Sequence, residues 1–154
     1  MTDTTALIER FYRAFQIRDA ATMAACYHDH ARFSDPVFTD LDAAGARAMW
    51  AMLCARGKDL RVEFRDVYAN QNTGSAHWEA WYTFSASGRK VHNVIDAKFE
   101  FRDGLILRHT DTFDFHRWAG QALGLTGKLL GGTAFLQNKV RTQGSMGLAE
   151  WRAK

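Results

Sequence analysis

Apolar residues recur at helical spacing in three segments of the first third of the chain. The first predicted helix begins near Asp3 or Thr4, and one face of it carries Leu7, Ile8, Phe11, Tyr12 and Phe15. A short second helix is expected over Ala20 to Tyr27 with Asp19 as its N-cap, and a third over Ala43 to Ala55 with Asp42 as its N-cap. The amino-terminal part is therefore helical.

Beyond residue 60 the pattern favours strands. They are expected at Leu60 to Asn70, Ser75 to Ser85, Arg89 to Phe101 and Leu105 to Phe115, with one short strand earlier, at Ala31 to Ser34. The connectors all contain glycine and suit hairpins, so the four late strands should form an antiparallel meander. Helices followed by a meander indicate an α+β fold in which three helices cover one face of a curved sheet.

The chain changes character after Phe115. Residues 116 to 154 carry apolar positions interrupted by glycines, with a hinge at Gly131-Gly132. We expect one or two short helices there, packing on the domain formed by residues 1 to 115 or on a partner chain. The stretch from Thr142 to Lys154 is weakly patterned and is expected to fray, although Leu148 and Trp151 could anchor it.

Composition narrows the class of protein. A chain of 154 residues with 47% hydrophobic residues can bury a core as one domain, and a net charge of +3 without basic runs argues against a nucleic-acid partner. Neither a signal peptide nor a membrane span is visible, and sparse positive charges disfavour a membrane-surface role. Two isolated cysteines predict reduced core thiols rather than a metal site. A cytoplasmic protein without a membrane partner is expected.

Asp96 is unusual because strands disfavour aspartate and this one lies in an otherwise apolar strand. The two-residue period of a strand puts Asp96 on the face of His92 and Val94, and Ile95 and Ala97 on the opposite face. One interpretation is a solvent-facing polar row. The other is a pair of polar groups that face a cavity, where burial would raise the pKa of the carboxyl.

Other candidate groups are Asp35, which precedes the single proline of the chain, and His109 and Asp111, which share a face of the last strand. Asp35 has a structural alternative, because an aspartate before proline can bond the backbone of its own turn. His109 and Asp111 have one too, since the two could belong to an outward polar face.

Several short motifs, in this order, resemble a known superfamily. They are Ile8-Glu9-Arg10-Phe11-Tyr12, Ala31-Arg32-Phe33-Ser34-Asp35-Pro36, Val94-Ile95-Asp96 and Phe101-Arg102-Asp103-Gly104-Leu105-Ile106. Together they resemble the SnoaL-like and ketosteroid-isomerase-like branch of the nuclear transport factor 2-like superfamily. The resemblance implies a cone-shaped curved antiparallel sheet around three helices, an apolar pocket, and a homodimer formed through sheet faces. It does not cover the carboxy-terminal segment.

The resemblance also implies roles for individual residues. Asp35 matches the general base of the isomerase, and Asp96 matches the protonated aspartate that donates to the enolate oxygen. The tyrosine that completes that oxyanion hole is replaced here by Phe11, which has no hydroxyl, and the neighbouring Tyr12 is turned away by about 100°.

Two functions remain open at this stage. The first is a cofactor-independent isomerase, cyclase or dehydratase that uses carboxylates on an apolar carbonyl compound; the second is a non-catalytic module of the same fold that binds a ligand or another protein. The candidate catalytic residues are Asp35, Asp96, His92 and His109. The candidate pocket residues are Phe11, Tyr12, Tyr27, Trp50, Trp81 and Asp111. No metal and no cofactor is expected.

Overall fold

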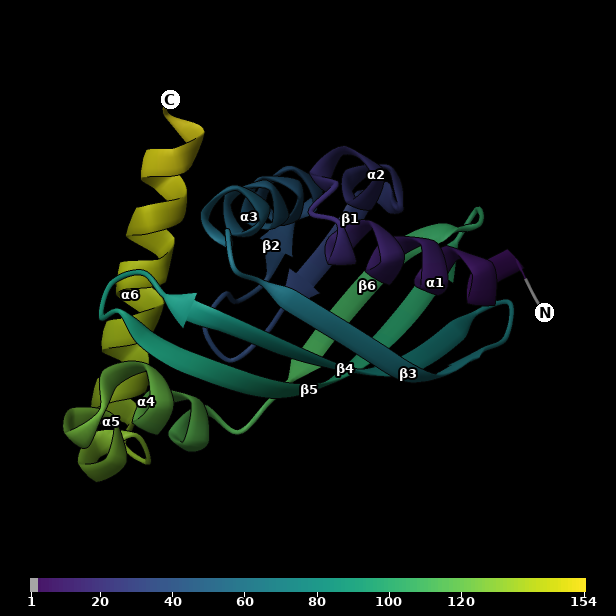
Figure 1. The fold of residues 1–154 in the computed structure, drawn as a ribbon. Coiled ribbons are helices and arrows are strands. Elements are labelled where there is room, and N and C mark those ends of the chain that lie inside the picture. Colours follow the sequence, from purple (N-terminus) through teal and green to yellow (C-terminus); the bar gives the residue numbers. More distant parts are fainter. Residues whose placement is uncertain (1–2) are drawn as a thin grey trace.

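The computed structural model describes residues 3–154, in which six helices and six strands are arranged around one sheet (Figure 1). The helices are α1 (Asp3–Gln16), α2 (Ala20–Ala25), α3 (Ala43–Arg56), α4 (Phe115–Leu123), α5 (Leu125–Leu130) and α6 (Ala134–Arg152). The strands are β1 (Tyr27–Ser34), β2 (Leu41–Asp42), β3 (Arg61–Ala69), β4 (Thr73–Phe84), β5 (Arg89–Arg102) and β6 (Leu105–Thr112).

The sheet confirms the predicted α+β class. Its strand order is β2-β1-β6-β5-β4-β3, and β3 to β6 form the expected antiparallel meander. β1 adds to the meander by pairing parallel with β6, with Phe33 opposite His109. The curved sheet with α1, α2 and α3 on one face is the cone that the resemblance implied (Figure 1).

The core lies between the inner face of the sheet and the amino-terminal helices. α1 buries Ile8, Phe11, Tyr12 and Phe15, the stripe that its spacing predicted. Trp50 of α3 is also buried and makes ring contacts with several of these side chains. Apolar burial of this kind is the main stabilising contribution to the fold.

The boundary between α2 and β1 differs from the prediction. The helix ends at Ala25, and Tyr27 is the first residue of β1 rather than the last residue of a helix. The carbonyl of Cys26 accepts a hydrogen bond from the backbone N–H of Ile106 in β6, at 2.9 Å. A partner 80 positions away in the sequence therefore sets this boundary, and no local pattern could reveal it.

The carboxy-terminal segment forms three helices that pack on the chain that carries them. Phe115 and Trp118 of α4 cluster with Leu136 and Val140 of α6 and with Val91 of β5. The expectation that residues 142 to 154 fray is wrong, because α6 continues to Arg152 and runs beside α3 (Figure 1). Burial of Leu148 in the main core stabilises this part of the helix.

None of the helices within residues 3–154 is long and apolar enough to cross a bilayer.

Candidate functional site

A cavity of about 340 Å³ lies between the inner face of the sheet and helices α3, α4 and α6. Its wall is mostly apolar and includes Phe15, Met49, Trp50, Trp78, Phe113 and Trp118. Polar side chains also line it, among them Asp35, Tyr82, Asn93 and Asp111. An apolar cavity with a few converging polar groups is the usual form of a small-molecule site.

Asp35 stands at the end of β1 and is held by its own turn. Its Oδ1 accepts hydrogen bonds from the backbone N–H groups of Val37 and Phe38, both at 2.7 Å. α6 fixes the same corner, because Arg141 Nε donates to the carbonyl of Pro36 at 2.9 Å. The predicted structural role and the predicted place in a pocket are therefore both present, since Oδ1 holds the turn while the side chain lines the cavity.

The environment of Asp35 favours the protonated carboxyl. Burial has the largest effect and raises the pKa of Asp35, and the negative charge of Asp111 raises it as well. The two backbone N–H groups and Arg141 lower it, and the resulting pKa is about 7. A carboxyl with this pKa is both a proton donor and a proton acceptor near neutral pH, which is the range required for general acid-base chemistry.

Asp111 ends a buried chain of hydrogen bonds. Trp50 Nε1 donates to the Tyr27 hydroxyl at 2.8 Å, the Tyr27 hydroxyl meets His109 Nδ1 at 2.8 Å, and His109 Nε2 meets Asp111 Oδ1 at 2.9 Å. Trp78 Nε1 donates to the same Oδ1 at 3.3 Å. Tryptophan can only donate, so the Tyr27 oxygen accepts from Trp50 and the Tyr27 hydrogen is left for His109 Nδ1. In that arrangement a neutral imidazole carries its proton on Nε2, facing Asp111.

The second oxygen of Asp111 has no such partner. Oδ2 is buried and makes no hydrogen bond to any residue within 3–154. A buried carboxylate oxygen without a partner is costly, and a catalytic role is one of the reasons for which proteins keep such a group. Asp111 thus lines the cavity with one oxygen fixed by His109 and Trp78 and the other oxygen without a partner.

The predicted pocket residues divide into three groups. Trp50 and Asp111 line the cavity. Phe11, Tyr12 and Tyr27 are fully buried behind its wall, where Phe11 packs edge-on against Tyr27, Trp50 and His109. Trp81 is outside the cavity, because its side chain stacks on His92, with ring centres 4.5 Å apart, on the outer face of the sheet.

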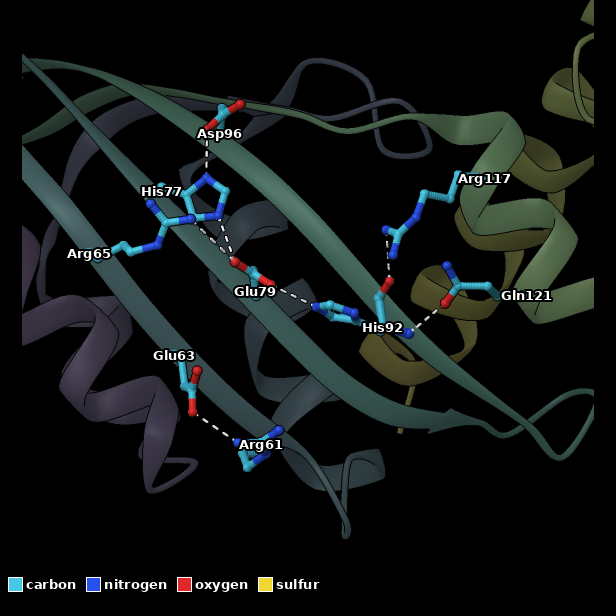
Figure 2. A network of polar contacts seen from close by, with 9 residues as sticks. All are labelled: Arg61, Glu63, Arg65, His77, Glu79, His92, Asp96, Arg117 and Gln121. Carbon is cyan, nitrogen blue, oxygen red and sulfur yellow. Dashed lines mark hydrogen bonds and ion pairs between the residues drawn. The ribbon is translucent and has the colours of Figure 1, made fainter.

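The prediction that Asp96 and His92 face the cavity is wrong. The Asp96 side chain is 77% exposed and its Oδ1 contacts His77 Nδ1 at 2.9 Å, while His92 Nε2 contacts Glu79 at 2.7 Å (Figure 2). These groups form a solvent-facing network on the outer face of β4 and β5. The polar-row interpretation is correct, because every second residue of β5 from Val91 to Phe101 is buried and Asp96 has the opposite parity.

Tyr82 and Asn93 line the cavity without having been singled out from the sequence. The signal was present, since Tyr82 shares a strand face with Trp78 and Asn93 shares one with Ile95. Burial raises the pKa of the Tyr82 hydroxyl to about 12, although the hydroxyl accepts a hydrogen bond from Trp118 Nε1. Tyr82 therefore stays protonated near neutral pH and offers a hydrogen-bonding group to the cavity.

The two cysteines are buried and are not activated as nucleophiles. Burial raises the pKa of the Cys54 thiol to about 11, and Cys26 is likewise buried and free. A thiol with such a pKa is not a ready nucleophile. Within residues 3–154 no group of three histidine, cysteine, aspartate or glutamate side chains could hold a metal ion.

Comparison with known proteins identifies relatives of this fold. The family model of the SnoaL-like domain matches residues 8–109. No curated protein sequence matches the chain.

Solved structures agree with that match at low sequence identity. A candidate polyketide cyclase from Xanthomonas campestris is 21% identical with a TM-score of 0.65 and covers 78% of this chain and 96% of its own. An LEH-like epoxide hydrolase from M. tuberculosis is 18% identical with a TM-score of 0.63 and coverages of 83% and 96%. TerC, crystallised with polyporic acid, is 19% identical with a TM-score of 0.63 and coverages of 76% and 98%. These similarities establish a shared fold.

Proposed function

The chain belongs to the SnoaL-like domain family, and on that premise we propose that it binds a small, flat, apolar carbonyl compound in the cavity and moves a proton beside the carbonyl group without a cofactor. The observation that carries the proposal is the pair of carboxyl groups, Asp35 and Asp111, that line one apolar cavity. Their surroundings differ, and a pair of carboxyls with divergent environments supports an acid and a base in one site.

The proposed step uses this pair in fixed roles. Asp111 Oδ2 takes a proton from the carbon next to the carbonyl, and its negative charge passes to the substrate oxygen as an enolate. The protonated carboxyl of Asp35 donates a hydrogen bond or its proton to that oxygen. His109 acts as a positioning residue, because its Nε2–H holds Asp111 Oδ1 in place. Reprotonation at a different carbon gives an isomer, and attack by the enolate on a second carbonyl gives a ring.

Exchange of α-protons tests this function without knowledge of the natural substrate. We expect the protein in D₂O to replace the α-protons of 1-tetralone by deuterium faster than buffer does, as followed by proton NMR. The cavity is large enough for such a bicyclic ketone. Binding of 1-tetralone without faster exchange would instead support the non-catalytic binding module.

Helix α6 forms part of the cavity wall, so larger side chains on α6 should reduce the size of the ligand that the cavity accepts. Gly147 lines the cavity, and a Cβ there would meet only Arg56 Nη1, at 3.8 Å, so a larger side chain fits and projects inward. We expect Gly147→Leu to weaken binding of 1-tetralone about tenfold by filling volume, while its thermal midpoint rises because glycine is a poor helix former. Gly147→Ala is the control, with a raised midpoint and nearly normal binding. Isothermal titration calorimetry measures the affinity for 1-tetralone, and scanning calorimetry measures the thermal midpoint. A Gly147→Leu variant with full affinity would contradict this placement of the ligand.

We also propose a cytoplasmic homodimer formed through the outer face of β3 to β5. The supporting observation is an ordered stack there, with the Arg61 guanidinium 3.9 Å from the Trp81 ring centre and His92 on the other side of the ring. Sedimentation equilibrium should give about twice the chain mass of 17.5 kDa, and Trp81→Glu should halve it. The control Ile17→Glu, at an exposed position of the helical side, should remain dimeric. A Trp81→Glu dimer would contradict the proposed interface.

A further inference from the structure

Exposed apolar side chains gather at one end of the molecule. Leu125, Leu129 and Phe135 are each 71% exposed and Leu130 is 40% exposed. They lie on α5 and the first turn of α6, beside α4 at the extremity of the fold (Figure 1). We call these four side chains the apolar tip. Clusters of this kind on a soluble surface usually mark an interaction site.

The backbone of this region forces the leucines outward. α5 packs on α4 through Gly127, where an added Cβ would collide with the backbone of Ala119 and Gly120. Leu125 and Leu129 are four residues apart and share a different face of the helix. With the glycine face against α4, the leucine face has to point to solvent.

Basic side chains lie next to the apolar tip. A surface pocket is lined by Arg89 and Lys90 of β5, Arg117 of α4 and Lys128 of α5, and Asp114 is its one acidic residue. All four basic residues are exposed. The sequence hides this cluster because its members come from three separate segments, and for that reason the positive charges looked too sparse for a membrane-surface role.

We propose that the apolar tip and the adjacent basic pocket bind the surface of an anionic phospholipid bilayer, with the leucines and Phe135 inserted among the lipids and the pocket on the headgroups. Protruding apolar residues flanked by positive charge are the pattern of interfacial binding. A second copy of the chain is disfavoured as the occupant, because it would bring the same positive pocket and a net charge of +3 to the contact.

The tip also adjoins the cavity. Trp118 and Leu123 of α4 and Val140 of α6 line the cavity, and the same two helices flank α5. An apolar compound dissolved in the bilayer would thus reach the site along the helices that touch the membrane. The membrane contact itself does not depend on the proposed function.

Co-sedimentation of the 154-residue chain with vesicles tests the proposal. We expect binding to vesicles of phosphatidylcholine mixed with phosphatidylglycerol, little binding to pure phosphatidylcholine, and loss of binding at about 1 M NaCl. Leu129→Ser and Lys128→Glu should each weaken binding roughly tenfold, because one removes inserted apolar surface and the other reverses a charge at the headgroups.

Matched controls lie far from the tip. Ile17 is 75% exposed, and Lys154 is an exposed lysine beyond the end of α6 that lies away from Phe135 (Figure 1), so Ile17→Ser and Lys154→Glu should bind vesicles as the unaltered protein does. Thermal midpoints of all variants show that each is folded. The proposal is overturned if the anionic vesicles are not bound, if the controls weaken binding as much as the tip variants, or if Leu129→Ser lowers the molecular mass in sedimentation, which would make the tip a contact between copies.

Discussion

Asp111→Asn should lower the rate of α-proton exchange on 1-tetralone by about 10²- to 10⁴-fold, the range that a positioned general base contributes. The amide keeps the shape of the side chain and can still accept hydrogen bonds from His109 Nε2 and Trp78 Nε1. It has no basic oxygen to take a proton at the position of Oδ2. Deuterium incorporation measured by NMR gives the rate, and isothermal titration should show that the ligand still binds.

Asp96→Asn is the matched control for this experiment. It makes the same chemical change in the same sheet, but at a side chain that is 77% exposed on the outer face. We expect its exchange rate to stay within about twofold of the unaltered protein, because a surface carboxylate contributes little to a distant site. Equal rates for Asp111→Asn and the unaltered protein would remove Asp111 from the mechanism, and a large loss in Asp96→Asn would show that the outer face matters instead.

The contrast between these two aspartates shows how far the sequence alone could lead. Similarity of the Val94-Ile95-Asp96 triplet pointed to Asp96, whereas the strand period already placed it opposite Ile95 and Ala97. The period was the better guide, because a shift of one residue moves a side chain to the other face of a sheet. The same period, applied to β6, correctly placed His109 and Asp111 on one face, but it left open whether that face is buried, as it is in the structure.

The fold was predictable because its signals are local. Helical spacing in α1, glycine-containing hairpins between the strands and the Asp42 cap of α3 each depend on a few neighbouring residues. Long-range contacts were not predictable. The hydrogen bond between Tyr27 and His109 joins residues 82 positions apart, and the Leu148 contact that holds α6 joins it to a core built from the other end of the chain.

The raised pKa of Asp35 connects activity with stability. An aspartate with an unfolded pKa near 3.8 and a folded pKa of about 7 binds more protons in the folded state between these two values. The free energy of unfolding therefore falls as pH rises through this window, by roughly 4 kcal/mol as an upper limit. Because the Asp35 side chain is only partly buried, water screens part of its charge, and we expect a decrease of about half this upper limit. At alkaline pH the folded state is therefore less stable, because the cavity position of Asp35 disfavours its ionised form.

Asp35→Asn should separate the two effects. The amide oxygen can still accept the hydrogen bonds from Val37 and Phe38, but it never carries the charge that burial disfavours. At pH 8 we expect the variant to be more stable than the unaltered protein by about 2 kcal/mol, with no gain at pH 4, where the unaltered carboxyl is protonated in the folded state. Urea unfolding at both pH values measures this difference.

The same variant should lose activity, because an amide cannot transfer a proton to the substrate oxygen. We expect a loss of about 10²-fold in exchange rate. In the unaltered protein the rate should fall above pH 7 as Asp35 loses its proton, and this fall should be missing in Asp35→Asn. Asp42→Asn is the control, since Asp42 also accepts a backbone N–H, at the start of α3, and asparagine caps a helix equally well. A gain in stability without a loss of activity would leave Asp35 a turn residue only, whereas a loss of activity without a gain at pH 8 would contradict the raised pKa.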